Sequence, residues 1–282
     1  TAYRRQRQMC IRDRGFRMLS NISLEWEIIK GLKFKTTGGA ELGYDYNNSY
    51  IPKYKWGMNE SKNTMQTVTS AYEQLYLWDN TLNYDKAFGK HRINAMIGTS
   101  YQEYKKESVS AAGSGRASEL TTELDNATKA TDVGGNSYRW ALMSYMARLH
   151  YSYDDRYLLT ATFRADGSSK FGKDNRFGYF PSFAAAWNIG NEAFMQSVKP
   201  VSLLKLRAGY GQTGNQNIGA YAFADKLSVN GVYNFGSQRG FESNLVNLIY
   251  PYLLSNPSVK WESVEQYNVG LDIGFLLSLI HI

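Results

Sequence analysis

The sequence is poor in the residues that several common protein classes require. One Cys and three His among 282 residues exclude a disulfide scaffold and leave little for a zinc site. There is no long apolar run, and the mean hydropathy is −0.46, which excludes a helical membrane protein with its ~20 apolar residues per span. Aromatic residues are abundant at 15%, which excludes a disordered chain. Richness in Tyr, Gly and Asn favours one large β architecture over two ordinary domains.

The two ends of the sequence differ from the rest. Residues 1–14 (TAYRRQRQMCIRDR) show no period, and both they and residues 277–282 (LSLIHI) resemble translated sequencing adapter. We therefore predict that both are non-native, that the domain spans 15–276 and that the natural chain extends beyond both ends. The alternative for 1–14 is a basic arm that binds nucleic acid or anionic lipid. Removing its five Arg and one Asp lowers the formal net charge from +7 to +3, so the basic pI carries no information about partners.

The dominant pattern is alternation with a period of two. Between residues 156 and 166, Leu159 and Phe163 fall on an apolar side, whereas Thr162 and Arg164 fall on a polar side. Many of the alternating runs exceed the ~5–6 residues of an ordinary strand and reach the ~9–11 residues that cross a bilayer. The predicted strands span 21–29, 32–47, 70–86, 90–107, 138–153, 156–166, 175–189, 201–213 and 260–275, with a further hairpin near 221–236.

The connections between these strands alternate in length. Tight turns at 30–31, 87–89 and 154–155 alternate with long polar stretches, which are 48–69, 108–137, 167–174 and 214–259. Short turns on one side and long loops on the other are typical of an outer-membrane barrel, whereas a β-sandwich would not sort loops by side. The exception is 190–200, where Asn191 is predicted to cap one helical turn over 192–197. The fold class is therefore all-β, a piece of an antiparallel transmembrane β-barrel with about 9–10 strands.

Charge placement agrees with a barrel wall. Lys or Arg at the bilayer midplane of a barrel costs about 2–4 kcal/mol, and most apolar faces have neither in their central stretch. Asn80 is the polar exception on the apolar side of 70–86, and Tyr and Trp gather towards strand ends as an interfacial girdle requires. Basic residues fall on the polar side and are predicted to face the lumen: Arg92, Arg148, Arg164, Lys205 and Arg207.

Several stretches resemble the SusC/RagA family of TonB-dependent outer-membrane transporters. Four carry most of the resemblance: FRADGSSKFG at 163–172, NRFGYFPSFAAAWNIGNEAFM at 175–195, LLKLRAGYGQTGNQ at 203–216 and NPSVKWESVEQYNVGLDIGF at 256–275. LEWEIIKGLK at 24–33 and DNTLNYDKAFGKHRINAMIG at 79–98 are similar to its middle barrel strands. The resemblance runs in order through most of 16–276.

The resemblance implies a barrel of about 22 strands closed by an N-terminal plug, of which this chain is a central-to-late part of the wall without plug, TonB-contacting segment or last strands. It implies import of oligosaccharides or peptides under a SusD/RagB-like surface lipoprotein, with energy from the TonB–ExbB–ExbD complex. It also implies a multi-pass β-barrel in contact with the lipids of a Bacteroidetes-type outer membrane. We expect no catalytic residues, cofactor, metal or nucleic-acid partner.

Motifs that suggest other chemistry have plainer explanations. Residues 209–214 match G-x-G-x-x-G, but no helix follows, so a barrel strand is favoured over a dinucleotide site. Residues 165–170 lack the spacing of a calcium loop and are read as an external turn. His91 and His150 are read as solvated lumen or rim residues.

Aromatic and amide side chains in the long loops are candidates for substrate contact. Aromatic rings pack against the C–H faces of sugars, and amides bond their hydroxyls. The alternative is that these rings pack loop against loop or lie near lipid headgroups. The candidates are Tyr54, Trp56, Asn215, Gln216, Tyr221, Tyr233 and Phe235.

Two rival functions stay open. An outer-membrane enzyme would need a catalytic cluster, for which His150 and Asp166 are the residues to replace. A soluble β-rich carbohydrate-binding module would stay in solution without detergent. The leading reading predicts aggregation of the isolated chain, because an open sheet has unpaired edges and a lipid-facing surface.

Overall fold

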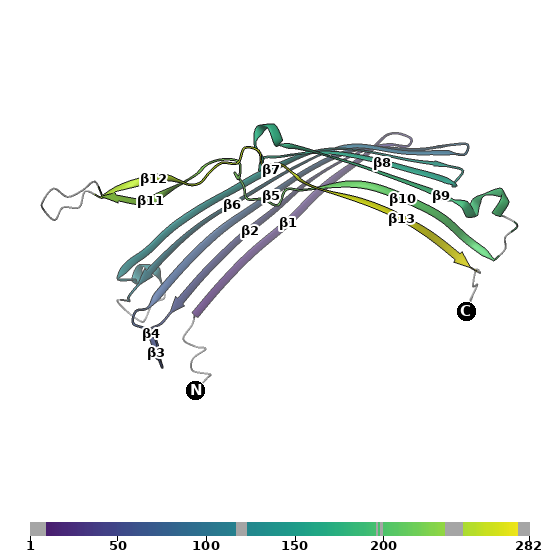
Figure 1. Ribbon diagram of the computed structural model, residues 1–282. Coiled ribbons are helices and arrows are strands. Elements are labelled where there is room, and N and C mark those ends of the chain that lie inside the picture. Colours follow the sequence, from purple (N-terminus) through teal and green to yellow (C-terminus); the bar gives the residue numbers. More distant parts are fainter. Residues whose placement is uncertain (1–9, 117–122, 196, 198–199, 235–244, 276–282) are drawn as a thin grey trace, which may run out of the picture. The chain divides into compact units, whose positions relative to one another are not determined.

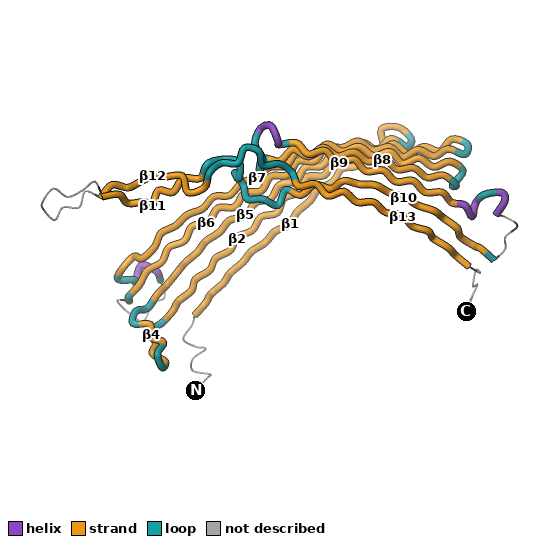
Figure 2. Tube along the Cα trace, viewed as in Figure 1, coloured by secondary structure: helices purple, strands orange, loops and turns teal. Residues whose placement is uncertain are grey.

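The computed structural model describes residues 10–116, 123–195, 197, 200–234 and 245–275, most of them in strands (Figure 2). The strands are long, and β7 reaches 25 residues. In chain order the elements are β1 (Cys10–Ile29), β2 (Leu32–Ile51), β3 (Tyr54–Trp56), β4 (Asn59–Ser61), β5 (Met65–Phe88), β6 (His91–Ser114), the 3₁₀ turn η1 (Leu124–Asn126), β7 (Lys129–Tyr153), β8 (Tyr157–Ser168), η2 (Lys173–Asn175), β9 (Phe177–Asn188), η3 (Ile189–Asn191), η4 (Ala193–Met195), β10 (Val201–Asn215), β11 (Lys226–Asn234), β12 (Leu245–Leu253) and β13 (Glu262–Phe275).

Nine of the strands form one sheet in the order β1-β2-β5-β6-β7-β8-β9-β10-β13. The short hairpins β3–β4 and β11–β12 form separate two-stranded sheets within two of the long connections. Backbone contacts divide the chain into two compact units, one with 1–24, 37–78 and 101–140 and one with 25–36, 79–100 and 141–282. In the second unit, β8, β9, β10 and β13 run side by side as antiparallel neighbours (Figure 1).

The strand register of the second unit separates an apolar face from a polar face. Residues paired across neighbouring strands point to the same side of a sheet, and successive residues point to opposite sides. One row across β7, β8, β9, β10 and β13 is apolar: Leu149, Ala161, Phe183, Tyr210 and Tyr267. The next row lies on the opposite face: Arg148, Thr162, Ser182, Gly211 and Gln266. The alternation therefore places the side chains as the sequence predicts.

The apolar face is open. Phe183 is 55% exposed and Tyr267 is 72% exposed, so these side chains are not the interior of a sandwich. Among the residues that the structure describes, only seven apolar side chains are buried, and four of them are Ala. The largest, Phe171, is fully buried and packs against Trp261 with ring centroids 5.1 Å apart. Phe180 meets the same indole edge-on at 5.4 Å.

Element boundaries differ from the prediction mainly at strand ends. The strand β1 begins at Cys10, so residues 10–14 continue a strand, and whether they are native stays a prediction. The strands β6 and β7 extend into the stretch 108–137, which shortens that loop. The hairpin predicted near 221–236 is wrong in extent, because β11 pairs with β12 beyond it.

The helical turn predicted over 192–197 is shorter in the structure, where the 3₁₀ turn η4 covers Ala193–Met195. The structure has two 3₁₀ turns, η3 and η4, and the residue before η3 is Asn188. Asn191 is not the N-cap of η4, because it is the last residue of η3 and Glu192 lies between the two turns. Its Nδ2 donates to the carbonyl oxygen of Asp155, 3.1 Å away. Asn80, the polar exception on β5, accepts a hydrogen bond at 2.8 Å from Thr36 Oγ1.

Candidate functional site

The polar face of the second unit carries most of the basic residues predicted to face the lumen. The register of β7 to β10 and β13 places four of them on that one face: Arg148, Arg164, Lys205 and Arg207. Arg207 is paired with Asp272 across the strands at 3.3 Å. Arg92 lies on β6 and contacts Asp85 at 3.4 Å. That these residues line a lumen stays a prediction.

Arg164 is held by partners on the same face. Its Nε donates to both carboxylate oxygens of Asp166, at 2.8 and 2.7 Å, and its Nη2 donates to Ser144 Oγ at 3.1 Å. Asp166 is 7% exposed and Ser144 is 1% exposed. The two partners fix the guanidinium in one orientation, and the Asp166 carboxylate balances its charge.

The loop after β8 packs on the segment that precedes β13. The backbone N–H of Ser168 donates to the carbonyl oxygen of Arg176, and Trp261 Nε1 donates to the same carbonyl at 3.0 Å. Asn175 Nδ2 donates to the carbonyl oxygen of Pro257 at 3.2 Å. With Phe171 buried beneath Trp261, these bonds give the loop a small core of its own.

Beside this loop, the polar face is hollowed by about 430 Å³. We call this hollow the polar hollow. Its lining comes from β7, β8, β9, the end of β10 with the residue after it, and the residue just before β13: Leu142, Thr162, Arg164, Asp166, Phe180, Ser182, Gln212, Thr213, Gly214, Gln216 and Trp261.

Only some of the predicted substrate contacts come together. Gln216 lines the polar hollow, and its neighbour Asn215 is bound to Glu262 Oε2 at 2.8 Å. Tyr221 is 51% exposed and faces Phe223 at 6.5 Å between centroids. Of the other candidates, Tyr54 lies in the other unit. The side chains of Trp56 and Tyr233, and the whole of Phe235, lie outside the described part of the chain.

Sequence reasoning missed Trp261, Phe180 and Asp166 as neighbours of Gln216. All three lie in the stretches that carry the family resemblance, and this shared location was the only feature of the sequence that could have linked them to Gln216. Their meeting depends on the pairing of β8 with β9 and of β10 with β13, which the sequence does not state.

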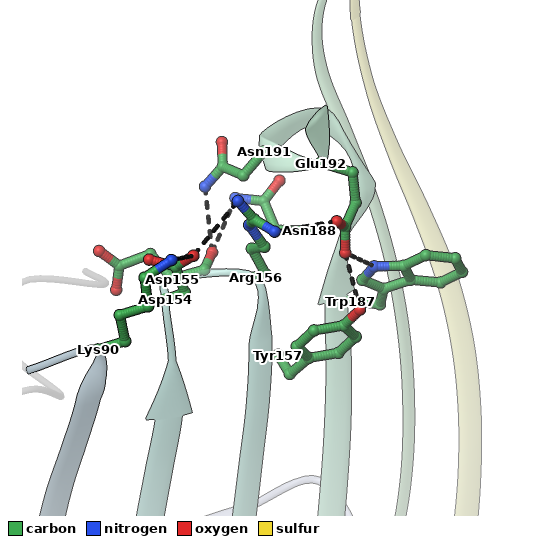
Figure 3. A network of polar contacts seen from close by, with 9 residues as sticks. All are labelled: Lys90, Asp154, Asp155, Arg156, Tyr157, Trp187, Asn188, Asn191 and Glu192. Carbon is green, nitrogen blue, oxygen red and sulfur yellow. Dashed lines mark hydrogen bonds and ion pairs between the residues drawn. The ribbon is translucent and has the colours of Figure 1, made fainter. Parts of the chain in front are cut away.

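A second polar cluster joins the short turns at the other strand ends (Figure 3). Lys90 Nζ pairs with Asp154 Oδ2 at 2.9 Å, and the Asp154 N–H donates to the Lys90 carbonyl oxygen at 2.7 Å. Asn188 and Asn191 both donate to the carbonyl oxygen of Asp155. These bonds connect three consecutive short turns.

Glu192 is the acceptor at the end of this cluster. It is 9% exposed and accepts from Arg156 Nη1 at 3.2 Å, Tyr157 Oη at 2.8 Å and Trp187 Nε1 at 3.1 Å (Figure 3). The indole and phenol hydrogen bonds, helped by the Arg156 charge, lower the pKa of Glu192 below its ordinary value. The ammonium of Lys90 likewise lowers the pKa of Asp154.

Each of the two histidines bonds a hydroxyl group on a neighbouring strand. His91 Nδ1 shares a hydrogen bond with Tyr151 Oη at 2.7 Å, and His150 Nδ1 shares one with Thr160 Oγ1 at 2.9 Å. Within the described ranges, no group of three or more His, Cys, Asp or Glu side chains is arranged to hold a metal ion. No helix in the described part is long and apolar enough to cross a membrane.

An antiparallel sheet with one exposed apolar face and one charged, polar face defines the wall of a membrane-spanning β-barrel. A family model described as "TonB dependent receptor-like, beta-barrel" matches residues 5–280. The chain therefore belongs to the β-barrel family of the TonB-dependent receptors, which are outer-membrane proteins and not enzymes.

Two curated relatives narrow the assignment within the TonB-dependent receptors. The chain is 33% identical over 272 residues to TonB-dependent receptor P3 of Formosa agariphila, covering 90% of this chain and 25% of the relative. It is 32% identical over 257 residues to TonB-dependent receptor SusC of Bacteroides thetaiotaomicron, covering 91% of this chain and 25% of the relative. The chain thus spans about a quarter of the length of these relatives.

Solved structures agree on the fold. The RagAB peptide transporter superposes with a TM-score of 0.85 at 23% identity, covering 98% of this chain and 30% of that chain. The RagAB peptide importer in its "closed-closed" state gives a TM-score of 0.83 and covers 95% and 29%. The resemblance to the SusC/RagA type is confirmed by these matches together.

Proposed function

We propose that the chain forms part of the barrel wall of an importer in the outer membrane of a Bacteroidetes-type bacterium. The importer takes up oligosaccharides or peptides, works with a SusD/RagB-like surface lipoprotein and is energised by TonB–ExbB–ExbD. The observation that carries the proposal is the pair of faces on β7 to β10 and β13, one exposed and apolar, the other polar and charged. The apolar face contacts lipid, and the polar face lines the route of the cargo.

The polar face suits passage of a hydrophilic solute. Its row of Arg148, Thr162, Ser182 and Gln266 offers hydrogen bonds at successive strands. Arg148 and Lys205 add positive charge to the same route, whereas Arg92, Arg164 and Arg207 are balanced by Asp85, Asp166 and Asp272. Opening of the route depends on segments of the whole protein, so this chain alone transports nothing.

Uptake in a bacterium that carries the complete gene tests the function. Deletion of the gene should abolish growth on one class of oligosaccharide or peptide as sole carbon source, and a plasmid copy should restore growth. The complete protein should fractionate with the outer membrane and co-purify with the surface lipoprotein. Recovery in the soluble fraction without detergent would support the rival soluble binding module instead.

A further inference from the structure

The polar hollow contains a buried acceptor that has no partner. Gln216 Oε1 is buried and forms no hydrogen bond, although buried polar side-chain atoms in folded proteins are usually paired. Leaving such an atom unpaired is costly unless something else supplies a donor. Because Gln216 also lines the hollow, a bound molecule is the natural source of that donor.

The position of Gln216 is fixed by its backbone. Its carbonyl oxygen accepts from the Ile218 N–H at 2.7 Å and from Lys170 Nζ at 3.4 Å. Lys170 is 8% exposed and belongs to the loop that is anchored by Phe171. These bonds fix the backbone at Gln216, and the burial of Oε1 limits the positions that the side chain can sample, so the acceptor is preorganised.

The charges of the lining cancel. Arg164 and Asp166 form an ion pair, so a ligand with a net charge would find no uncompensated partner among the lining side chains. The remaining polar groups are the hydroxyls of Thr162, Ser182 and Thr213, the carboxamides of Gln212 and Gln216, and the indole N–H of Trp261. This combination favours a neutral ligand rich in O–H groups.

The hollow also has an aromatic wall. Trp261 is held by its bond to the Arg176 carbonyl oxygen and by the ring contact with Phe180, so its indole is rigid. An indole beside amides and hydroxyls suits a ring that has one C–H face and hydroxyls at its edge. A sugar ring has both features, whereas a peptide also brings backbone amides that need matching partners in series.

We propose that the polar hollow is a subsite for one neutral sugar ring of the cargo. A ring hydroxyl donates to Gln216 Oε1, and the ring packs against Trp261. This inference rests on the proposed import function and selects oligosaccharide over peptide for this site.

The test measures binding by the complete protein in detergent. Titration calorimetry uses maltohexaose, cellohexaose, laminarihexaose, xylohexaose and mannohexaose as probes, with pentaalanine as the peptide probe. The variants Gln216→Ala and Gln216→Met both remove the acceptor, and Gln216→Met keeps the length of the side chain. Gln102→Met, on β6 and outside the lining, is the matched control. Folding of each variant is checked by its heat-modifiable mobility on a gel.

Wild-type protein should bind at least one hexasaccharide, and both Gln216 variants should bind it about five- to tenfold more weakly, as expected for one lost hydrogen bond. The control should bind as wild type does. The proposal is overturned if no hexasaccharide binds, if only pentaalanine binds, or if folded Gln216 variants keep full affinity. The growth test separates this failure from failure of the import function, because growth would still be lost on deletion and restored by the plasmid copy when only the subsite is wrong.

Discussion

Glu192 shows how one carboxylate can connect several turns. Its three donors come from Arg156, Tyr157 and Trp187, which are 36, 35 and 5 residues away in the sequence. Each of these bonds to a charged acceptor is stronger than a bond between neutral groups. The stability of the linked turns should therefore depend on the charge of this one side chain.

Replacement of Glu192 by Gln should lower the unfolding temperature by a few degrees at neutral pH. Gln has nearly the same shape, but it lacks the charge that Arg156 faces and keeps only one acceptor oxygen. The measurement is thermal unfolding of the complete protein in detergent, followed by tryptophan fluorescence. The variant Glu60→Gln, at an exposed position in the β3–β4 hairpin, should unfold as wild type does.

The effect of Glu192 should depend on pH. Its folded-state pKa lies below the ordinary value of 4.5, so its ionisation stabilises the fold above pH 4.5. This stabilisation is lost as the pH falls through the folded-state pKa. The difference in unfolding temperature between wild type and Glu192→Gln should therefore be constant near neutrality and shrink below pH 4.5. A difference that grows on acidification would contradict this assignment.

Gly31 is required by the turn between β1 and β2. Its φ is +87°, and an added Cβ would lie 2.4 Å from the carbonyl oxygen of Asp85. The variant Gly31→Ala should be destabilised by about 1–3 kcal/mol because the clash is with backbone and the dihedral is strained. Gly38→Ala, where a Cβ meets nothing within 4 Å, should change stability by about 0.5 kcal/mol or less. Denaturant titration of refolded protein in vesicles compares the two.

At the scale of single residues, composition predicted some of the site but not its contacts. The polar character of the loop after β10 was enough to select Asn215 and Gln216. The role of Glu192 was invisible, because its partners Arg156 and Tyr157 reach it only after two turns become neighbours. The predicted cap at Asn191 was wrong because Asn191 itself ends the turn η3, a turn that the sequence did not predict.

At the scale of elements, β9 offers a direct test of the two faces. Ala184 and Ala185 are consecutive and both exposed, and the register places Ala184 beside Thr160 and Ala185 beside Leu159. The variant Ala185→Arg should cost about 2–4 kcal/mol in a bilayer, because it places a charge in the hydrocarbon. Ala184→Arg adds the same side chain to the polar face and should cost about 1 kcal/mol or less. Unfolding in lipid vesicles measures both.

Equal costs for the two alanine variants would mean that the faces are not distinguished by lipid and water. A larger cost for Ala184→Arg would reverse the assignment of the faces. Either result would remove the main support for the barrel wall.

The existence of the main strands could be predicted because a period of two is a strong signal over ten or more residues. Their ends could not, because in β6 and β7 the strand continues into polar segments such as 129–137 that lack apolar alternation. There the pairing of neighbouring strands, and not side-chain burial, extends the ladder. The partner of β11 was missed because β12 lies far along the polar stretch 214–259.

At the scale of the whole molecule, the isolated 282-residue chain should not be soluble without detergent. The nine-stranded sheet ends at β1 on one side and β13 on the other, and its apolar side chains are exposed. Unpaired edges and apolar surface both promote aggregation. Ultracentrifugation of refolded chain should find it in the pellet without detergent and in the supernatant with it. A soluble, protease-resistant monomer would contradict the prediction.

The scarcity of buried apolar side chains has a wider consequence. Among the residues described, Phe171 and six other apolar residues are the only apolar side chains that the protein buries. Most of its apolar side chains are exposed and depend on the surrounding lipid for burial, so the hydrocarbon thickness of the host bilayer contributes to stability. Substitution of exposed apolar positions such as Leu159 and Val269 by other apolar residues should change stability little, because no neighbouring side chain packs closely around them.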